Sequence, residues 1–306
     1  MSGRTGSSSL LDVLVKSVLA LGLGLASVRT KAFEPSKGHT VAIGCFVGKI
    51  SLPLLTFNTL ATSKLGDLNW LVIFATSGAK VAVYSAIFIV VYLAYVPQRS
   101  RGQRVLTANL FATFGIATMD FPLGLPVIEA VYGSRMIVYI GANAFVGTCF
   151  LTPIVMVVFE IGQFMKQREE VGESEAPAFW KVLSRICLNP LMLCTLAGVF
   201  YSIALTWTLI EEGDSRGFPH PVSDVIDFLT VPFATLALFL TGTSLTSADL
   251  CFWALFLVLM KVCVCAFLSY FISAALIPGD GNPEVELRNF SFFYGCIPSG
   301  TIVLVL

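Results

Sequence analysis

Two opposite charges lie inside long apolar runs of the sequence. Lys80 follows Ala75-Thr76-Ser77-Gly78-Ala79, and Asp120 lies six residues before Pro126. Ionisable groups at membrane depth are costly and mark ligand or proton pathways by default. We therefore predict that Lys80 and Asp120 form the charged centre of a cavity. Lys80 would hold an anion or pair with Asp120, and Asp120 would carry a proton or contact the substrate.

Two other polar residues in apolar runs, Asn58 and Glu129, each have two interpretations. Asn58 follows the run around Pro53 and either faces the cavity or bonds a neighbouring helix. Glu129 either lines an exit path, as a second proton-coupling candidate, or makes a structural hydrogen bond. Three further charges lie nearer helix ends, where extension toward the membrane surface explains them: Lys49, Glu160 and Lys261.

Composition excludes several kinds of chemistry. Of 306 residues, 56% are hydrophobic and 12% charged, with a mean hydropathy of +0.84, so most of the chain must lie in a bilayer. The 19 basic and 19 acidic residues balance, which disfavours nucleic acid. The chain has only two histidines, and its eight cysteines include no Cys-x-x-Cys pair. We expect no metal or other cofactor and no enzymatic activity.

Apolar windows predict an all-α polytopic membrane protein with nine spans. They cover residues 8–27, 40–62, 70–96, 105–131, 136–163, 189–209, 222–245, 250–277 and 289–306. The first window has a signal peptide as its alternative. If helices alternate, ten basic residues fall on one side and five on the other, which predicts a non-cytoplasmic N-terminus. The loop within 164–188 predicts a cytoplasmic linker with an interfacial helix, between halves 1–163 and 189–306.

Matching prolines suggest that the halves are copies. The stretch of chain from Pro53 to Pro232 is nearly as long as the stretch from Pro126 to Pro298. An odd number of helices between copies inverts the second, as in many secondary transporters. Pro126, with Gly124 nearby, and Pro298 predict two broken helices that cross at mid-membrane, with helix N-termini aimed at an anion.

A set of motifs is spread over nearly the whole sequence: Leu52-Pro53-Leu54-Leu55-Thr56-Phe57, Lys80, Gly124-Leu125-Pro126 with Tyr132-Gly133, Phe159-Glu160, Asn189-Pro190 and Ile297-Pro298-Ser299-Gly300. In these motifs the sequence resembles the auxin efflux carrier (PIN-like) family. It is most similar to the animal branch, in which the carrier fold precedes a receptor-like domain. Plant members have Asn at the position of Met119 and Asp at that of Thr76.

This resemblance implies an inverted repeat of five and five helices, with the fourth and ninth crossing at Pro126 and Pro298, and a possible homodimer. Ser299 joins the crossover site on this basis. Only eight residues follow Pro298, so we expect an incomplete ninth helix and no tenth. The animal branch is associated with sterol-dependent nutrient signalling, which favours a lysosomal or other endomembrane location over the plasma membrane.

Two functions follow as hypotheses. The first is a secondary carrier of a small, auxin-like organic anion at the crossover. The alternative is a cholesterol-binding membrane sensor that uses the carrier fold as a scaffold. For the alternative, Leu93 to Arg99 fits a proposed cholesterol motif with Tyr95 and Arg99 as contacts, although an interfacial tyrosine beside arginine is also ordinary.

Overall fold

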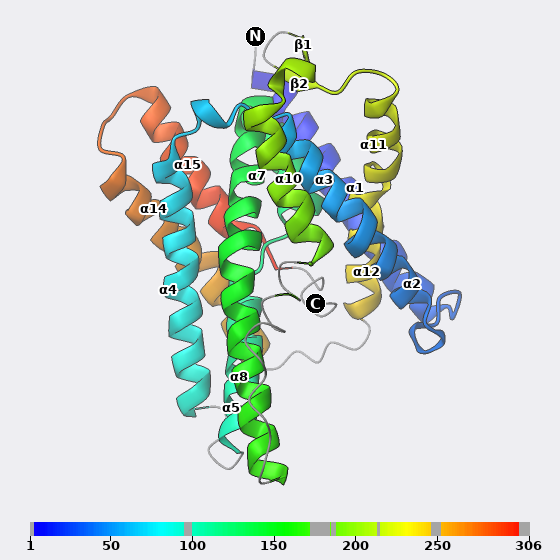
Figure 1. Cartoon of the computed structure of the whole chain (residues 1–306), viewed down its shortest axis with the longest axis vertical. Helices are drawn as coiled ribbons and strands as arrows, with labels where there is room; N and C mark the ends of the chain where they lie inside the picture. Colours follow the sequence, from blue (N-terminus) through cyan, green and yellow to red (C-terminus); the bar gives the residue numbers. More distant parts are fainter. Residues whose placement is uncertain are drawn as a thin grey trace.

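The chain folds almost entirely into helices, as expected where lipid offers no partner for backbone polar groups. The computed structural model describes residues 3–94, 100–171, 184, 188–212, 215–245 and 252–299. Within them, the strands are a short antiparallel hairpin of β1 (Ile210–Glu212) and β2 (Ser215–Gly217). Figure 1 shows the helices packed side by side, mostly along the long axis.

The described residues of the first half of the chain contain five helical spans, three of which carry an internal π turn. They are α1 (Gly3–Arg29); α2 (His39–Phe46) with a π turn over Val47–Ser51 and α3 (Leu52–Ala61); α4 (Trp70–Ala94); α5 (Arg101–Ile116) with a π turn over Asp120–Gly124 and α6 (Leu125–Tyr132); and α7 (Ile137–Val146) with a π turn over Gly147–Leu151 and α8 (Thr152–Val171).

The described residues of the second half contain four helical spans. They are α10 (Pro190–Ala204); α11 (Val222–Thr230) with α12 (Pro232–Ser244); α13 (Phe252–Leu259) with a π turn over Met260–Cys265 and α14 (Ala266–Leu276); and α15 (Asn282–Cys296). Single 3-10 turns connect several of these spans, at Pro35–Lys37, Leu65–Asp67, Ser134–Met136 and Thr206–Thr208.

Seven of the described helices are long and apolar enough to cross a membrane. The predicted span 189–209 is a shorter apolar helix, Pro190–Ala204. The predicted span 289–306 was wrong in its bounds, because its helix begins at Asn282 and ends at Cys296. Pro283 favours a helix start, and Pro298 prevents continuation. A hydropathy window cannot detect either effect, since the first turns of α15 are charged.

A first bundle contains α1, α3, α10 and α12, and glycines allow the close contact between α1 and α12. A Cβ added to Gly24 would lie 2.2 Å from the carbonyl oxygen of Phe239, and one added to Gly242 would lie 2.1 Å from that of Leu21. The second close pair is α3 with α10. There, a Cβ on Gly198 would lie 2.9 Å from the Phe57 carbonyl oxygen.

A second bundle contains α4, α5, α8, α14 and α15. α4 packs against α5 and α14, α5 against α8, and α14 against α15. Glu169 on α8 accepts hydrogen bonds from the backbone amides of Arg101 and Gly102, at 3.1 and 3.3 Å. A carboxylate at a helix N-terminus satisfies free amides and complements the helix dipole. The contact fixes the start of α5 against α8.

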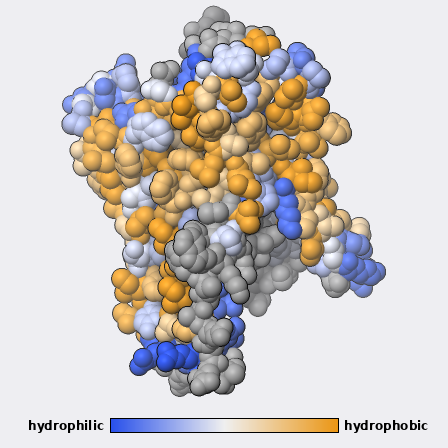
Figure 2. Space-filling view, in the orientation of Figure 1, coloured by the Kyte–Doolittle hydropathy of each residue, from blue (hydrophilic) through white to orange (hydrophobic). Residues whose placement is uncertain are grey.

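The surface is apolar where a bilayer would contact it. Figure 2 shows apolar side chains over much of the coloured part of the visible face, with hydrophilic ones gathered toward its ends. Large apolar side chains such as Phe200 and Phe228 are mostly exposed. Exposed apolar area of this extent is unusual for a soluble monomer. The chain is therefore an all-α, multi-pass membrane protein. The predicted interfacial helix, near 179–183, lies outside the described residues.

Candidate ligand-binding site

The fourth span is interrupted between α5 and α6, at Ala117–Met119. Pro122 explains the position, because its ring clashes with the carbonyl of the residue four earlier, Thr118, and it has no amide to donate. The helix restarts at Met119, whose carbonyl accepts from the amides of Leu123 and Gly124. Our placement of this break at Pro126 was wrong, since Pro126 lies in the first turn of α6. Proline is well tolerated there.

The end of α15 meets this interruption. α15 ends at Cys296, and Ile297 is extended, as is usual for a residue before proline. The Met119 amide donates to the Pro298 carbonyl at 3.0 Å. Gly124 permits the approach, because a Cβ there would lie 2.9 Å from the Ile297 side chain. Two chain segments from opposite halves of the sequence thus join through a backbone hydrogen bond.

Lys80 is the central cation at this meeting point. Its side chain is buried, and its ammonium donates to the Tyr294 hydroxyl at 2.7 Å and to Thr118 Oγ1 at 3.2 Å. The ammonium also lies 4.6 Å from the centre of the Tyr294 ring, within cation–π range. The direct Lys80–Asp120 pair that we predicted is absent from the ion pairs of the described residues. A tyrosine and a threonine hold the ammonium instead.

Two further charged groups near this centre have a buried atom without a hydrogen-bonding partner in the described structure. These atoms are Oδ1 of Asp120 and Nζ of Lys261. Lys261 is 1% exposed, so our interpretation of it as a lysine extending to the membrane surface was wrong. It lies in the π turn between α13 and α14, within electrostatic range of both Lys80 and Asp120.

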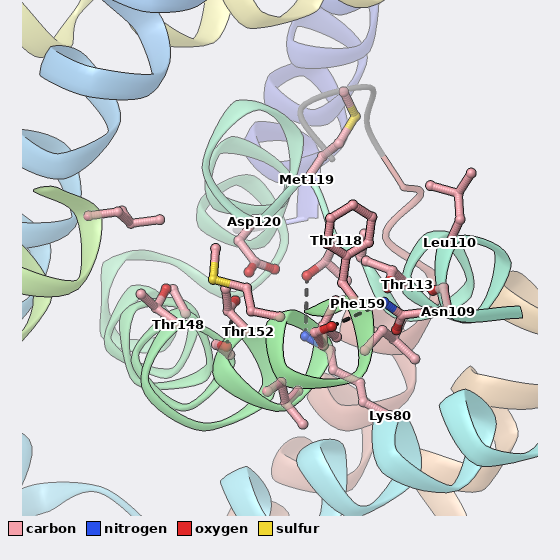
Figure 3. Close-up of a pocket in the computed structure, with 18 of the residues that line it drawn as sticks. Lys80, Asn109, Leu110, Thr113, Thr118, Met119, Asp120, Thr148, Thr152 and Phe159 are labelled. Carbon is pink, nitrogen blue, oxygen red and sulfur yellow. Dashed lines mark hydrogen bonds between the residues drawn. The ribbon is translucent and has the colours of Figure 1, made fainter. Parts of the chain in front are cut away.

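An amphipathic cavity of about 470 Å³ opens beside the interruption. This volume falls in the usual range of small-molecule pockets, roughly 300 to 1,000 Å³. Figure 3 shows side chains from α5, from the interruption and from the π turn and first turns of α8 around it. Its polar lining is Lys80, Asp120, Thr56, Gln103, Thr107, Asn109, Thr113, Thr118, Thr148 and Thr152. The rest of the lining is mainly apolar and includes Leu106, Leu110, Val155, Met156 and Phe159.

Two of the predicted site residues, Lys80 and Asp120, line this cavity. Among the described residues, the others lie outside its lining: Asn58, Gly124, Pro126, Glu129, Pro298 and Ser299. Glu129 is exposed on α6. Pro298 accepts the backbone hydrogen bond from Met119, and Gly124 lies against the Ile297 side chain. Tyr95 and Arg99 lie outside the described residues, so the sterol motif stays a prediction.

Sequence reasoning missed Tyr294, Thr118 and Lys261. Tyr294 and Thr118 carried no signal, because a tyrosine or threonine in an apolar span is ordinary. Lys261 did carry a signal in the sequence. The number of residues between Lys80 and Lys261 is close to the number between the matched prolines, such as Pro53 and Pro232. A search for charged residues at the spacing of the predicted repeat would have related Lys261 to Lys80.

The fold and the cavity define the class of this chain. It is a multi-pass helical membrane protein with an amphipathic cavity beside an interrupted helix. No profile of a known protein family matches the chain. The chain is similar to the lysosomal cholesterol signaling protein of Mus musculus, with 24% identity between the two sequences over 266 residues. The match covers 84% of this chain and 29% of the relative, so the chain spans less than a third of that protein's length.

Proposed function

We propose that this chain binds a sterol in the Lys80–Asp120 cavity and acts as a sensor or scaffold in a lysosomal or related membrane. The observation that carries the proposal is the cavity itself, whose volume and mostly apolar lining suit a rigid apolar body with one polar end. The name of the mouse relative supports the same ligand and compartment.

An inverted repeat is part of this proposal. It pairs α1 with α10 and α3 with α12, so that the α1–α12 contact and the α10–α3 contact become equivalent. Gly24 against the Phe239 carbonyl then corresponds to Gly198 against the Phe57 carbonyl. The two glycines, and likewise the two phenylalanines, are separated along the chain by nearly the same length as the matched prolines. In the same scheme the interruption before α6 and the end of α15 are the two crossing points.

A carrier of a small organic anion is the second candidate. Its support is the meeting of the interruption before α6 with the end of α15, close to the buried Lys80. Transporters use discontinuous helices of this kind at mid-membrane. The carboxylate of Asp120 in the cavity lining opposes it, because its charge offsets the attraction of Lys80 for an anionic ligand. We therefore place the sterol sensor first.

A binding and flux experiment separates the two. The chain is reconstituted in vesicles, and photolabelling by a diazirine cholesterol analogue and uptake of labelled aromatic carboxylates are measured together. Val155→Trp fills the cavity and should abolish saturable labelling. Val157→Trp, two residues along α8 and outside the lining, is the matched control and should leave labelling intact. Saturable carboxylate flux without sterol labelling would overturn the sensor.

A further inference from the structure

The carboxylate of Asp120 is incompletely satisfied where it borders the cavity. Its Oδ1 is buried without a hydrogen-bonding partner among the described residues, and the residue contributes to the cavity lining. Oδ1 is closed even to water, so a ligand in the cavity meets the remaining part of the carboxylate, on a residue that is only half-buried. A carboxylate taken out of bulk water is stabilised when a donor reaches it. The cavity therefore offers an acceptor to any ligand that brings a donor.

The surrounding charges restrict what that donor can be. A ligand cation would approach Lys80, which lines the cavity, and Lys261 behind it. A ligand anion would approach the Asp120 carboxylate, whose charge offsets that of Lys80 in the same lining. Lys80 is already engaged by Tyr294 and Thr118. A neutral hydroxyl donates to the carboxylate and meets neither repulsion.

The apolar lining accommodates the rest of such a ligand. Leu110 on α5 and Phe159 on α8 line the cavity and are each about 45% exposed, so they mark an opening on the apolar outer surface. A lipid could enter sideways from the bilayer through this opening. Figure 3 shows the Asp120 carboxylate on the side of the cavity away from Leu110. The polar end of the ligand then lies deepest and the apolar tail nearest the lipid.

We propose that the Asp120 carboxylate is the hydroxyl-recognition group of this site and accepts a hydrogen bond from the 3β-hydroxyl of the bound sterol. The inference rests on the proposed function, since it names the group that selects within the sterol class. It assigns the Lys80–Tyr294 contact a structural role and leaves the selection of ligand to Asp120.

The test combines changes in the ligand with changes in the protein. Binding of cholesterol, its 3α epimer and the 3-ketone is measured on the full chain in nanodiscs. The wild-type chain should bind both analogues about tenfold or more weakly, the loss expected for a hydrogen bond to a charged group. Asp120→Leu should weaken cholesterol binding by a similar factor and bind the three sterols alike. Asp227→Leu, at an exposed position on α11, is the matched control and should keep the preference.

Three results are decisive. Equal binding of the three sterols by the wild-type chain overturns the hydroxyl role while leaving a sterol site in place, and it needs no variant to fold. A preference that survives in Asp120→Leu assigns the hydroxyl to another residue and also overturns the inference. Failure of the wild-type chain to bind any of the three overturns the proposed function together with the inference.

Discussion

Replacing Tyr294 with phenylalanine removes one hydroxyl from the centre of the protein and leaves its ring. The lost contact is the 2.7 Å hydrogen bond from the Lys80 ammonium. A hydrogen bond to a charged group contributes about 1.5–3 kcal/mol. The cation–π contact at 4.6 Å remains available to phenylalanine. We therefore expect Tyr294→Phe to lower the free energy of unfolding by about 1.5–3 kcal/mol.

The assay is denaturant unfolding in mixed micelles, followed by tryptophan fluorescence. Tyr270→Phe on α14 is the matched control, because its ring packs against Phe271 and Phe292 while no hydrogen bond of its hydroxyl is found in the described structure. The control should change the free energy of unfolding by less than about 0.5 kcal/mol.

A double-mutant cycle with Lys80→Met then assigns the loss to the pair. If the hydrogen bond is the cause, Tyr294→Phe should cost almost nothing once the ammonium is gone. Equal costs of Tyr294→Phe in both backgrounds, or a cost no larger than that of Tyr270→Phe, would refute the reasoning. Lys80 would then be held mainly by Thr118 or by the ring.

Two further changes test the packing and the buried charge. Gly242→Ala places a Cβ against the Leu21 carbonyl and should lower the free energy of unfolding by about 1–3 kcal/mol. Gly22→Ala, with open space around it, should be neutral or stabilising. Similar unfolding midpoints for the two variants would show that α1 and α12 separate freely. Lys261→Met replaces a buried ammonium that has no partner in the described structure with an apolar side chain of similar length. Lys261→Met should raise the thermal midpoint of unfolding, whereas Lys80→Met should not, because it leaves the Tyr294 hydroxyl without its donor. A lower midpoint for Lys261→Met would mean that Lys261 is paired in the membrane.

The sequence by itself determined the class of the protein and most of its helices. Apolar runs predict spans because a helix in lipid must satisfy its own backbone, and this requirement is local. Lys80 and Asp120 were also predictable as cavity residues, since the cost of a charge at membrane depth can be read from its neighbours in sequence.

The tertiary structure alone decided how these residues are used. Lys80 takes its partner from Tyr294, 214 positions away, and not from Asp120. Lys261 is buried because α4 and α15 pack around its π turn, although its sequence position suggests a helix end. Such outcomes depend on which helices meet and at what depth. That choice is set by the close approach of backbones at glycines such as Gly24 and Gly242, which no single segment specifies.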